Sequence, residues 1–251
     1  MAHPRNIKVE IQYLGTNYHG WQLQSNGPTI QGELERALSK VLQEDVRLIG
    51  SGRTDAGVHA IRQVANFFTR REIPLVGILK GANSLLPDDI AILEVEEVPE
   101  DFHARKSAKK KCYLYRIVES NSRLPLFLDR AWVLGPGLDI QRMGDACKLL
   151  VGTHDFKAFQ RSGSSVKTTT RTIYLCEVST STWEGHRCIE ILVAANGFLR
   201  YMVRNIVGIL VKIGRGDLGP DAIEIMLNNK ERTYAFKTAP ACGLYLKEVY
   251  Y

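Results

Sequence analysis

Residues 50–60, GSGRTDAGVHA, place an arginine and an aspartate two positions apart between glycines, just before an apolar run. In extended backbone, residues two apart point to the same face, so Arg53 and Asp55 can project together while Gly57 lets the chain turn. Such a carboxylate has two interpretations. It caps the turn, which is the commoner role of an isolated aspartate there, or it is an active-site nucleophile.

A second group of residues favours the active-site interpretation. The apolar pattern predicts a helix over residues 198–213, with Arg200 and Arg204 one turn apart on its other face. Its buried stripe would consist of Phe198, Met202, Ile206, Ile209 and Ile213. An arginine held against Asp55 would keep that carboxylate ionised despite partial burial. Gly208 inside the helix predicts close packing against another backbone.

A basic stretch, DFHARKSAKKKCYLYRI, lies near the middle of the chain. Its cations and tyrosines are Arg105, Lys106, Lys109, Lys110, Lys111, Tyr113 and Tyr115. Such a stretch is either a solvated surface or an RNA groove, in which cations meet phosphates and aromatic rings stack on bases. The net charge of +6 favours a polyanionic partner without deciding between them.

Other patterns give weaker candidates. His154 and Asp155, with Ser162, Ser164 or Ser165, suggest a hydrolase triad, but the sequence lacks the G-x-S-x-G nucleophile elbow and adjacent residues seldom orient one another. Walker, zinc-protease and dinucleotide motifs are missing, as is an acidic metal-binding cluster. The sequence therefore predicts chemistry that needs neither a metal nor another cofactor.

Composition places the chain among ordinary globular proteins. It has 251 residues, 45% of them hydrophobic, which is enough for a large core. Its five cysteines are scattered without a C-x-x-C pair, so we expect reduced, mostly buried thiols and not disulfides or structural zinc. The sequence contains neither a membrane-span run nor a secretory signal, so we expect a cytoplasmic protein without membrane association.

Periodicity predicts the same order of elements in both halves of the chain. The first half has strands at 7–14, 46–50, 63–69 and 90–98 and helices at 29–44 and 75–85. The second half has strands at 110–119, 172–180, 187–194 and 243–250 and helices at 140–151 and 198–213. The order β-α-β-β-α-β is that of the ferredoxin-like unit, whose antiparallel sheet has helices on one face. We therefore expect two α+β domains, residues 1–105 with the Asp55 loop and residues 106–251.

Taken together, these motifs resemble the TruA family of tRNA pseudouridine synthases. GSGRTDAGVHA is similar to the family's catalytic motif. The likeness continues through YHGWQLQ, TIQGELERAL, DFHARKSAKKKCYLYRI, DFKAF, MVRNIVG and APACGLYLKEVYY, and this ordered set covers nearly the whole chain. The chain departs from the family pattern at Lys106, where an aromatic residue is more usual, and at Lys111, where arginine is.

The resemblance implies an enzyme that isomerises uridine to pseudouridine in the anticodon stem-loop of tRNA, typically at positions 38, 39 and 40, without a cofactor. It implies that Asp55 is the catalytic carboxylate and that Arg204 pairs with it. Tyr113 matches the tyrosine that packs on the target base, Leu244 an apolar residue lining that pocket, and Arg53 would position the flipped nucleotide. Further RNA contacts are expected at Arg105, Lys109, Lys110, Lys111 and Arg200.

The resemblance also implies two ferredoxin-like or RRM-like halves related by pseudo-twofold symmetry. They share a joined, mostly antiparallel central sheet with helices on one face and a cleft on the other, and the protein forms a homodimer that binds tRNA. Two alternatives remain open: a non-catalytic RNA-binding protein, and a pseudouridine synthase acting on another RNA. Against the first, the strand QVANFFT lacks the aromatic RNP signature, and GRTDAG contains a carboxylate that a phosphate-binding site disfavours.

Overall fold

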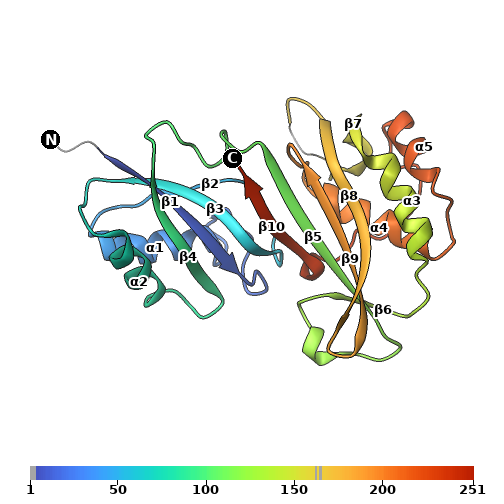
Figure 1. Ribbon diagram of the computed structural model, residues 1–251, viewed down its shortest axis with the longest axis horizontal. Coiled ribbons are helices and arrows are strands. Elements are labelled where there is room, and N and C mark those ends of the chain that lie inside the picture. The colour runs from blue at the N-terminus through green and yellow to red at the C-terminus, as the bar shows by residue number, and fades with distance from the viewer. Residues whose placement is uncertain (1–3, 162, 164–165) are drawn as a thin grey trace. The chain divides into compact units, whose positions relative to one another are not determined.

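The computed structural model describes residues 4–161, 163 and 166–251 (Figure 1). The chain splits into two compact units, unit 1 with Met1–Lys109 and Tyr245–Tyr251, and unit 2 with Lys110–Leu244. Both units are mixed α+β structures with mostly antiparallel sheets. The division falls four residues after the expected boundary at 105/106, and the last strand, expected in the second domain, lies in unit 1.

Unit 1 follows the expected β-α-β-β-α-β order. Its elements are β1 (Arg5–Tyr13), α1 (Ile30–Leu42), β2 (Ile49–Gly50), β3 (His59–Thr69), α2 (Leu75–Asn83) and β4 (Ile90–Val98). Two strands differ clearly from the expected bounds. β2 has only two residues where 46–50 was expected, and β3 begins at His59, directly after the Asp55 loop, where 63 was expected.

The core of unit 1 lies between one face of its sheet and the two helices. Alternate residues of β1, from Ile7 to Tyr13, are at most 2% exposed and point to the helix side. Figure 1 shows α1 and α2 together on that face. Thr29 begins α1 by accepting a hydrogen bond from the Gly32 amide at 3.2 Å, as an N-cap does. The opposite face carries ion pairs such as Lys8–Glu96.

Strand β3 has two short neighbours along one edge. β4, β1 and β3 pair antiparallel, and β2 pairs with β3 at Ala65 and Asn66. β10 (Leu244–Tyr250) pairs in parallel with the start of β3, Tyr245 beside His59. The brevity of β2 leaves that part of the edge open for β10, which is why the last strand belongs to unit 1.

Unit 2 contains more elements than the sequence predicted. They are β5 (Lys110–Glu119), β6 (Trp132–Leu134), α3 (Ile140–Leu150), β7 (Gly152–Asp155), β8 (Thr170–Trp183), β9 (His186–Ala195), α4 (Met202–Gly214) and α5 (Ala222–Asn229). Strands β5, β9, β8 and β7 form an antiparallel sheet in that order, and β6 pairs in parallel with β5. The strands β6 and β7 and the helix α5 were not predicted, because each is too short to show a clear period.

Helix α4 starts later than its apolar pattern predicts. It begins at Met202 because Tyr201 has a left-handed backbone with φ of 66°. Phe198 and Arg200 therefore precede the helix, and the prediction that Arg200 shares a helical face with Arg204 is wrong. The prediction for Gly208 is confirmed, because a Cβ there would lie 2.2 Å from the carbonyl oxygen of Lys237.

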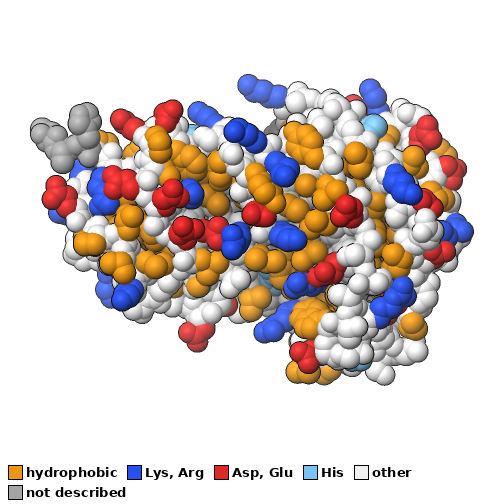
Figure 2. Space-filling view, viewed as in Figure 1, with side chains coloured by type: hydrophobic (Ala, Val, Ile, Leu, Met, Phe, Trp, Pro, Cys, Tyr) orange, Lys and Arg blue, Asp and Glu red, His pale blue; other side chains and the backbone are white. Residues whose placement is uncertain are grey.

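Two compositional expectations can be checked directly. Within the described residues the five cysteines carry no disulfide, and all except Cys242 are buried, which confirms the predicted thiol state. None of the helices described has the length and apolar composition needed to cross a membrane. On the face that Figure 2 shows, acidic and basic side chains are mixed with apolar ones, so the positive charge forms no continuous surface there.

Candidate active site

The Asp55 loop joins β2 to β3 in unit 1. Its turn is closed by the main chain, because the Val58 amide donates to the carbonyl oxygen of Asp55 at 3.1 Å. Gly57 has a φ of +75°, the positive value that the third position of a type II turn requires. The side chain of Asp55 is half-buried and that of Arg53 is exposed.

The segment before α1 holds the loop from one side. The Trp21 amide donates to the carbonyl oxygen of Thr54 at 3.1 Å. Gly20, with φ of +93°, packs so closely that a Cβ would lie 2.5 Å from that same oxygen. Gly15 is equally constrained, since its Cβ would lie 2.0 Å from the carbonyl oxygen of Val58. The main chain on both sides of Asp55 therefore has a fixed position.

Buried polar side chains hold the loop from below. The Tyr13 hydroxyl and the Thr54 hydroxyl are 2.8 Å apart in a hydrogen bond, and burial raises the pKa of Tyr13, which stays protonated. The Ser51 hydroxyl donates to Gln63 at 2.6 Å, and the Gln63 amide donates to the carbonyl oxygen of Gly52 at 3.0 Å. Fully bonded buried groups make a rigid support, which is what a catalytic carboxylate needs.

Arg53, predicted to position the flipped nucleotide, and Arg105, predicted to contact RNA, line the same cavity of unit 1. Its volume is about 590 Å³, and His103 and Lys106 also line it. Trp21 and Leu48 provide apolar surface. This cavity is basic, and it includes Arg53 of the Asp55 loop.

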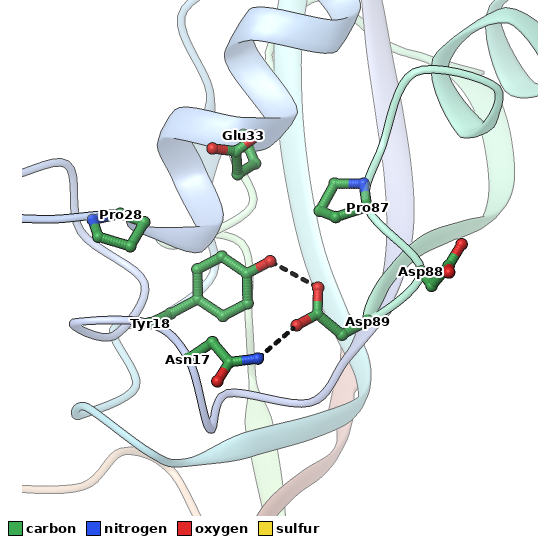
Figure 3. A pocket seen from close by; sticks show the side chains of 7 residues that line it. All are labelled: Asn17, Tyr18, Pro28, Glu33, Pro87, Asp88 and Asp89. Atoms are coloured by element: carbon green, nitrogen blue, oxygen red, sulfur yellow. Dashed lines mark hydrogen bonds between the residues drawn. The ribbon is translucent and has the colours of Figure 1, made fainter.

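A second cavity of unit 1 has the opposite charge. Its volume is about 420 Å³, and Glu33, Asp88 and Asp89 line it. Figure 3 shows Tyr18 and Asn17 directed at Asp89, to which they donate at 2.5 and 3.2 Å. Burial, and then the Asp89 carboxylate, raise the pKa of Tyr18, so the phenol remains a donor. Because its carboxylates repel phosphate, this cavity does not suit RNA.

In unit 2, Tyr113 lies on β5 and Leu244 begins β10, and they are 8% and 6% exposed. The Tyr113 ring meets Phe198 edge-on, with ring centroids 5.0 Å apart. This contact fixes the ring while the hydroxyl chemistry of tyrosine is retained. Both residues therefore belong to well-packed parts of unit 2.

Arg200 and Arg204 are brought together by Tyr201, a residue that the sequence analysis did not single out. Their guanidinium carbons lie 5.6 and 4.5 Å from the centre of the Tyr201 ring, and that of Arg161 lies 5.1 Å away. Arg204 also donates to the carbonyl oxygen of Ala239 at 2.7 Å. The strained backbone of Tyr201 thus supports three cations at the start of α4.

The three consecutive lysines, 109 to 111, lie at the start of β5. Lys109 is exposed, and its amide donates to the carbonyl oxygen of Tyr250 at 2.8 Å. Lys110 and Lys111 are half-buried at the start of β5. Regular strand backbone therefore holds this end of the basic stretch.

The hydrolase interpretation finds no support at His154 and Asp155. Asp155 accepts from the Lys157 amide and from the Thr169 hydroxyl, at 3.1 and 2.5 Å, and so caps the 3₁₀ turn Phe156–Phe159. His154 uses Nε2 in a 3.1 Å contact with the carbonyl oxygen of Val151. The serines 162, 164 and 165 lie outside the described residues.

A comparison with known protein families identifies the family of this chain. A family model described as tRNA pseudouridine synthase matches residues 10–105 and 146–251, which include the Asp55 loop and the start of α4. The chain belongs to the tRNA pseudouridine synthase family. The match confirms the resemblance to TruA proteins that the motifs indicated.

Relatives in the tRNA pseudouridine synthase family match over nearly the whole chain. A protein of Thermoanaerobacter sp. strain X514 is 44% identical over 98% of this chain and 100% of its own length. One from Ruminiclostridium cellulolyticum is 47% identical with the same coverage, and both are named tRNA pseudouridine synthase A. A protein of Clostridium perfringens, named tRNA pseudouridine synthase A 2, is 47% identical over the same shares.

The sequence did not predict several residues at the Arg53 cavity and at the start of α4. Trp21 and His103 line the cavity of Arg53, together with Arg105 and Lys106 of the basic stretch. These residues are far apart in the sequence, which does not show that they meet. The sequence did carry one signal, because Trp21 and His103 both lie in motifs that resemble the family. Tyr201 had none, since nothing in an apolar helical pattern predicts a left-handed residue.

Proposed function

We propose that this protein isomerises uridine to pseudouridine in the anticodon stem-loop of tRNA, at positions 38, 39 and 40, with Asp55 as the catalytic carboxylate. Membership of the tRNA pseudouridine synthase family supports the reaction. The observation that carries the role of Asp55 is its loop, which main-chain hydrogen bonds and buried polar side chains hold in a fixed position. Preorganisation of this kind is characteristic of catalytic groups.

The reaction rearranges bonds without changing the composition of the nucleotide. The bond from N1 of uracil to C1′ of the ribose breaks, the base turns, and a bond from C5 to C1′ forms. The proton on C5 is lost and N1 gains a proton, so the net change is an isomerisation. Since the reaction transfers no electrons or atoms to another molecule, we propose that it needs no cofactor.

The carboxylate can act at either of two atoms. Asp55 can add to C6 of the base, or it can act at C1′ as the glycosidic bond breaks. In both routes the carboxylate must be ionised to act as a nucleophile. We assign this support to Arg204, because the resemblance gives it that role and a cation beside a carboxylate favours the charged form.

The target uridine must leave its stem before either route can begin. Unstacking costs a few kcal/mol, which contacts to the flipped base and its backbone repay. We propose that Tyr113 packs on the flipped base, that Leu244 contributes apolar surface and that Arg53 holds the backbone. The packed positions of Tyr113 and Leu244 and the exposed position of Arg53 suit these roles.

Two further properties follow from the resemblance. We propose that the protein is a homodimer and that each unit is a ferredoxin-like half. The β-α-β-β-α-β order of unit 1 supports the second proposal. Light scattering of the purified protein tests the first, and a mass corresponding to a single chain would contradict it.

The proposed reaction has a direct test in the release of the C5 proton. Transfer RNA labelled with tritium at C5 of uridine should release tritium to water when the protein is added. Sequencing of the treated tRNA should locate pseudouridine at positions 38 to 40. A protein that binds tRNA without releasing tritium would be a binding module, and modification elsewhere would indicate another RNA target.

A further inference from the structure

The basic cavity of unit 1 has a role beyond the chemistry at Asp55. We infer that it is a subsite for one nucleotide that flanks the target uridine in the RNA strand: its rim holds the phosphate and its apolar floor receives the base. This inference rests on the proposed function. It adds a place where the enzyme grips the strand next to the reacting nucleotide.

The rim has the charge that a phosphate requires. Arg53, Arg105 and Lys106 are exposed cations, and no carboxylate is among the described residues that line the cavity. Arg53 belongs both to the rim and to the Asp55 loop, since it lies two residues before Asp55.

The loop that carries Arg105 and Lys106 is ordered by His103. The Nδ1 atom of His103 accepts hydrogen bonds from the amides of Arg105 and Lys106, at 3.2 and 3.3 Å. The Ser107 hydroxyl accepts from the His103 amide at 3.1 Å, and the Ser107 amide donates to the His103 carbonyl oxygen at 2.9 Å. These hydrogen bonds therefore fix the backbone that carries Arg105 and Lys106.

A buried pair of amides fixes this loop to the sheet. Asn66 accepts from the Ala104 amide at 2.9 Å and donates to Asn6 at 2.8 Å, and Asn6 donates to the carbonyl oxygen of Phe102 at 2.9 Å. Asn6 and Asn66 are 2% and 0% exposed. Burial of polar amides is favourable only when they are bonded, so this network makes the loop rigid. A merely solvated basic loop needs no such support.

The floor of the cavity is equally fixed. Trp21 and Leu48 are 2% and 6% exposed and offer an apolar surface beneath the rim. Gly50 lies against the indole so closely that a Cβ would be 2.5 Å from its Nε1. Apolar side chains and the amides of Gln22 and Gln31 beneath a cationic rim suit a nucleotide better than a phosphate ion alone, and about 590 Å³ is within the usual range of small-ligand sites.

The first experiment removes the two cations of the loop. We compare R105A/K106A with the control pair K40A/K80A, which removes two exposed lysines from helices of the same unit. Binding of an anticodon stem-loop RNA is measured over a range of salt concentrations. We expect R105A/K106A to bind at least about 10-fold more weakly and its log–log salt slope to fall by roughly 0.7 to 0.9, the value for one lost phosphate contact.

The control pair should bind within about 2-fold of wild type. Thermal unfolding of all three proteins checks that each is folded, since the exchanged side chains are exposed. If R105A/K106A binds with the affinity and salt slope of the control pair, the rim does not contact the RNA and the inference is wrong.

The second experiment locates the contact on the RNA. Each phosphate near the target uridine is replaced singly by an uncharged methylphosphonate. One replacement should weaken binding to wild type and to K40A/K80A but have a clearly smaller effect on R105A/K106A, because the variant has already lost two of the three cations that meet this phosphate. Equal losses in all three proteins at every position would overturn the subsite. An abasic nucleotide next to that phosphate should also weaken wild-type binding, and an unchanged affinity would show that no base enters.

These results can be separated from the fate of the proposed function. Tritium release by the same wild-type preparation reports the reaction, whereas the binding cycle reports the subsite. Release of tritium without any coupling between the rim and a phosphate would reject the subsite alone. Coupling without tritium release would reject the proposed function and leave an RNA-binding cavity.

Discussion

Asp55 and Asp155 lie in similar local sequences, each just after a glycine-containing segment and near a turn, but they are used differently. Asp155 in unit 2 accepts from the Lys157 amide and the Thr169 hydroxyl, and the Lys230 ammonium lies 3.6 Å from its other oxygen. Its carboxylate therefore builds the turn. In unit 1 the main chain closes the Asp55 turn, through the Val58 amide.

This difference separates a structural aspartate from a candidate catalytic one. The turn at Asp55 is closed by main chain, has Gly57 at its positive-φ position, and is anchored through Thr54 and Ser51. At Asp155 one carboxylate oxygen accepts two hydrogen bonds of the turn, and an uncharged side chain accepts them less strongly. The same substitution at the two positions should therefore affect different properties.

The largest expected effect is that of Asp55→Asn on turnover. Asparagine is nearly isosteric but uncharged, so the protein should fold and bind tRNA while single-turnover conversion falls on the order of 10⁴-fold, as for other lost nucleophiles. Conversion is measured by tritium release with enzyme in excess over tRNA. A rate near that of wild type would remove Asp55 from the mechanism.

Asp155→Asn is the matched control. The amide cannot serve two donors as well as the carboxylate does, so the free energy of unfolding should fall by about 1 kcal/mol, typical of a lost cap. The conversion rate should stay within about 2-fold of wild type. A large loss of activity without a loss of stability would make Asp155 a functional residue and would break the comparison.

A smaller but still large effect on tRNA binding is expected for the three lysines at the start of β5. Reversal of Lys109, Lys110 and Lys111 to glutamate should weaken tRNA binding by about 10² and lower the log–log salt slope by about 2, because phosphate contacts are lost. The control triple reverses the exposed lysines 40, 80 and 157. An unchanged slope for the first triple would assign those lysines to an ordinary solvated surface.

Aromatic residues extend the comparison with a moderate effect. Tyr113→Phe keeps the ring and its edge contact with Phe198, whereas Tyr113→Leu removes both. We expect Leu to reduce the single-turnover rate about 10- to 100-fold, since base stacking contributes about 1 to 3 kcal/mol. A loss with Phe as large as that with Leu would show that the hydroxyl, and not stacking, is the essential group.

Phe156→Leu provides the aromatic control beside Asp155. Phe156 is fully buried, and its ring centroid lies 5.8 Å from that of Phe159. The substitution should lower the free energy of unfolding by about 1 kcal/mol and leave the conversion rate unchanged. A fall in rate without a fall in stability would contradict the division between the two regions.

Most of the long elements of the fold could be predicted from the sequence, because their burial follows a simple period. The alternation from Ile7 to Tyr13 and the helical spacing of Ile30, Leu34 and Leu38 record which face meets the core. The place of β10 could not be predicted in this way. It depends on the free edge beside His59, which exists only because β2 is short.

The candidate site also has a part that the sequence predicts and a part that it does not. Arg53 and Asp55 could be found because one short motif contains both. The rim of the basic cavity could not, since the position of Lys106 beside Arg53 depends on the buried contact between Asn6 and Asn66, which are 60 residues apart. Such long-range polar contacts leave no period in the sequence.

The smallest effect concerns the pH dependence of Asp155. The hydrogen bond from Thr169, followed by those from the Lys157 amide and the effect of Lys230, lowers the pKa of Asp155 below its ordinary value. A carboxyl whose pKa is depressed on folding contributes stability above its unfolded pKa of about 3.9, and this contribution is lost as the pH falls through the folded pKa.

Urea unfolding of wild type and Asp155→Asn at several pH values should therefore give a constant difference above about pH 5 that shrinks below about pH 4. Because solvent screens this group, the pH-dependent part should be less than about 1 kcal/mol. Thr169→Val removes the leading cause of the shift and should flatten the dependence. If the difference between wild type and Asp155→Asn persisted unchanged at pH 3, the carboxylate charge would not be what stabilises this turn, and the contrast with Asp55 would rest on shape alone.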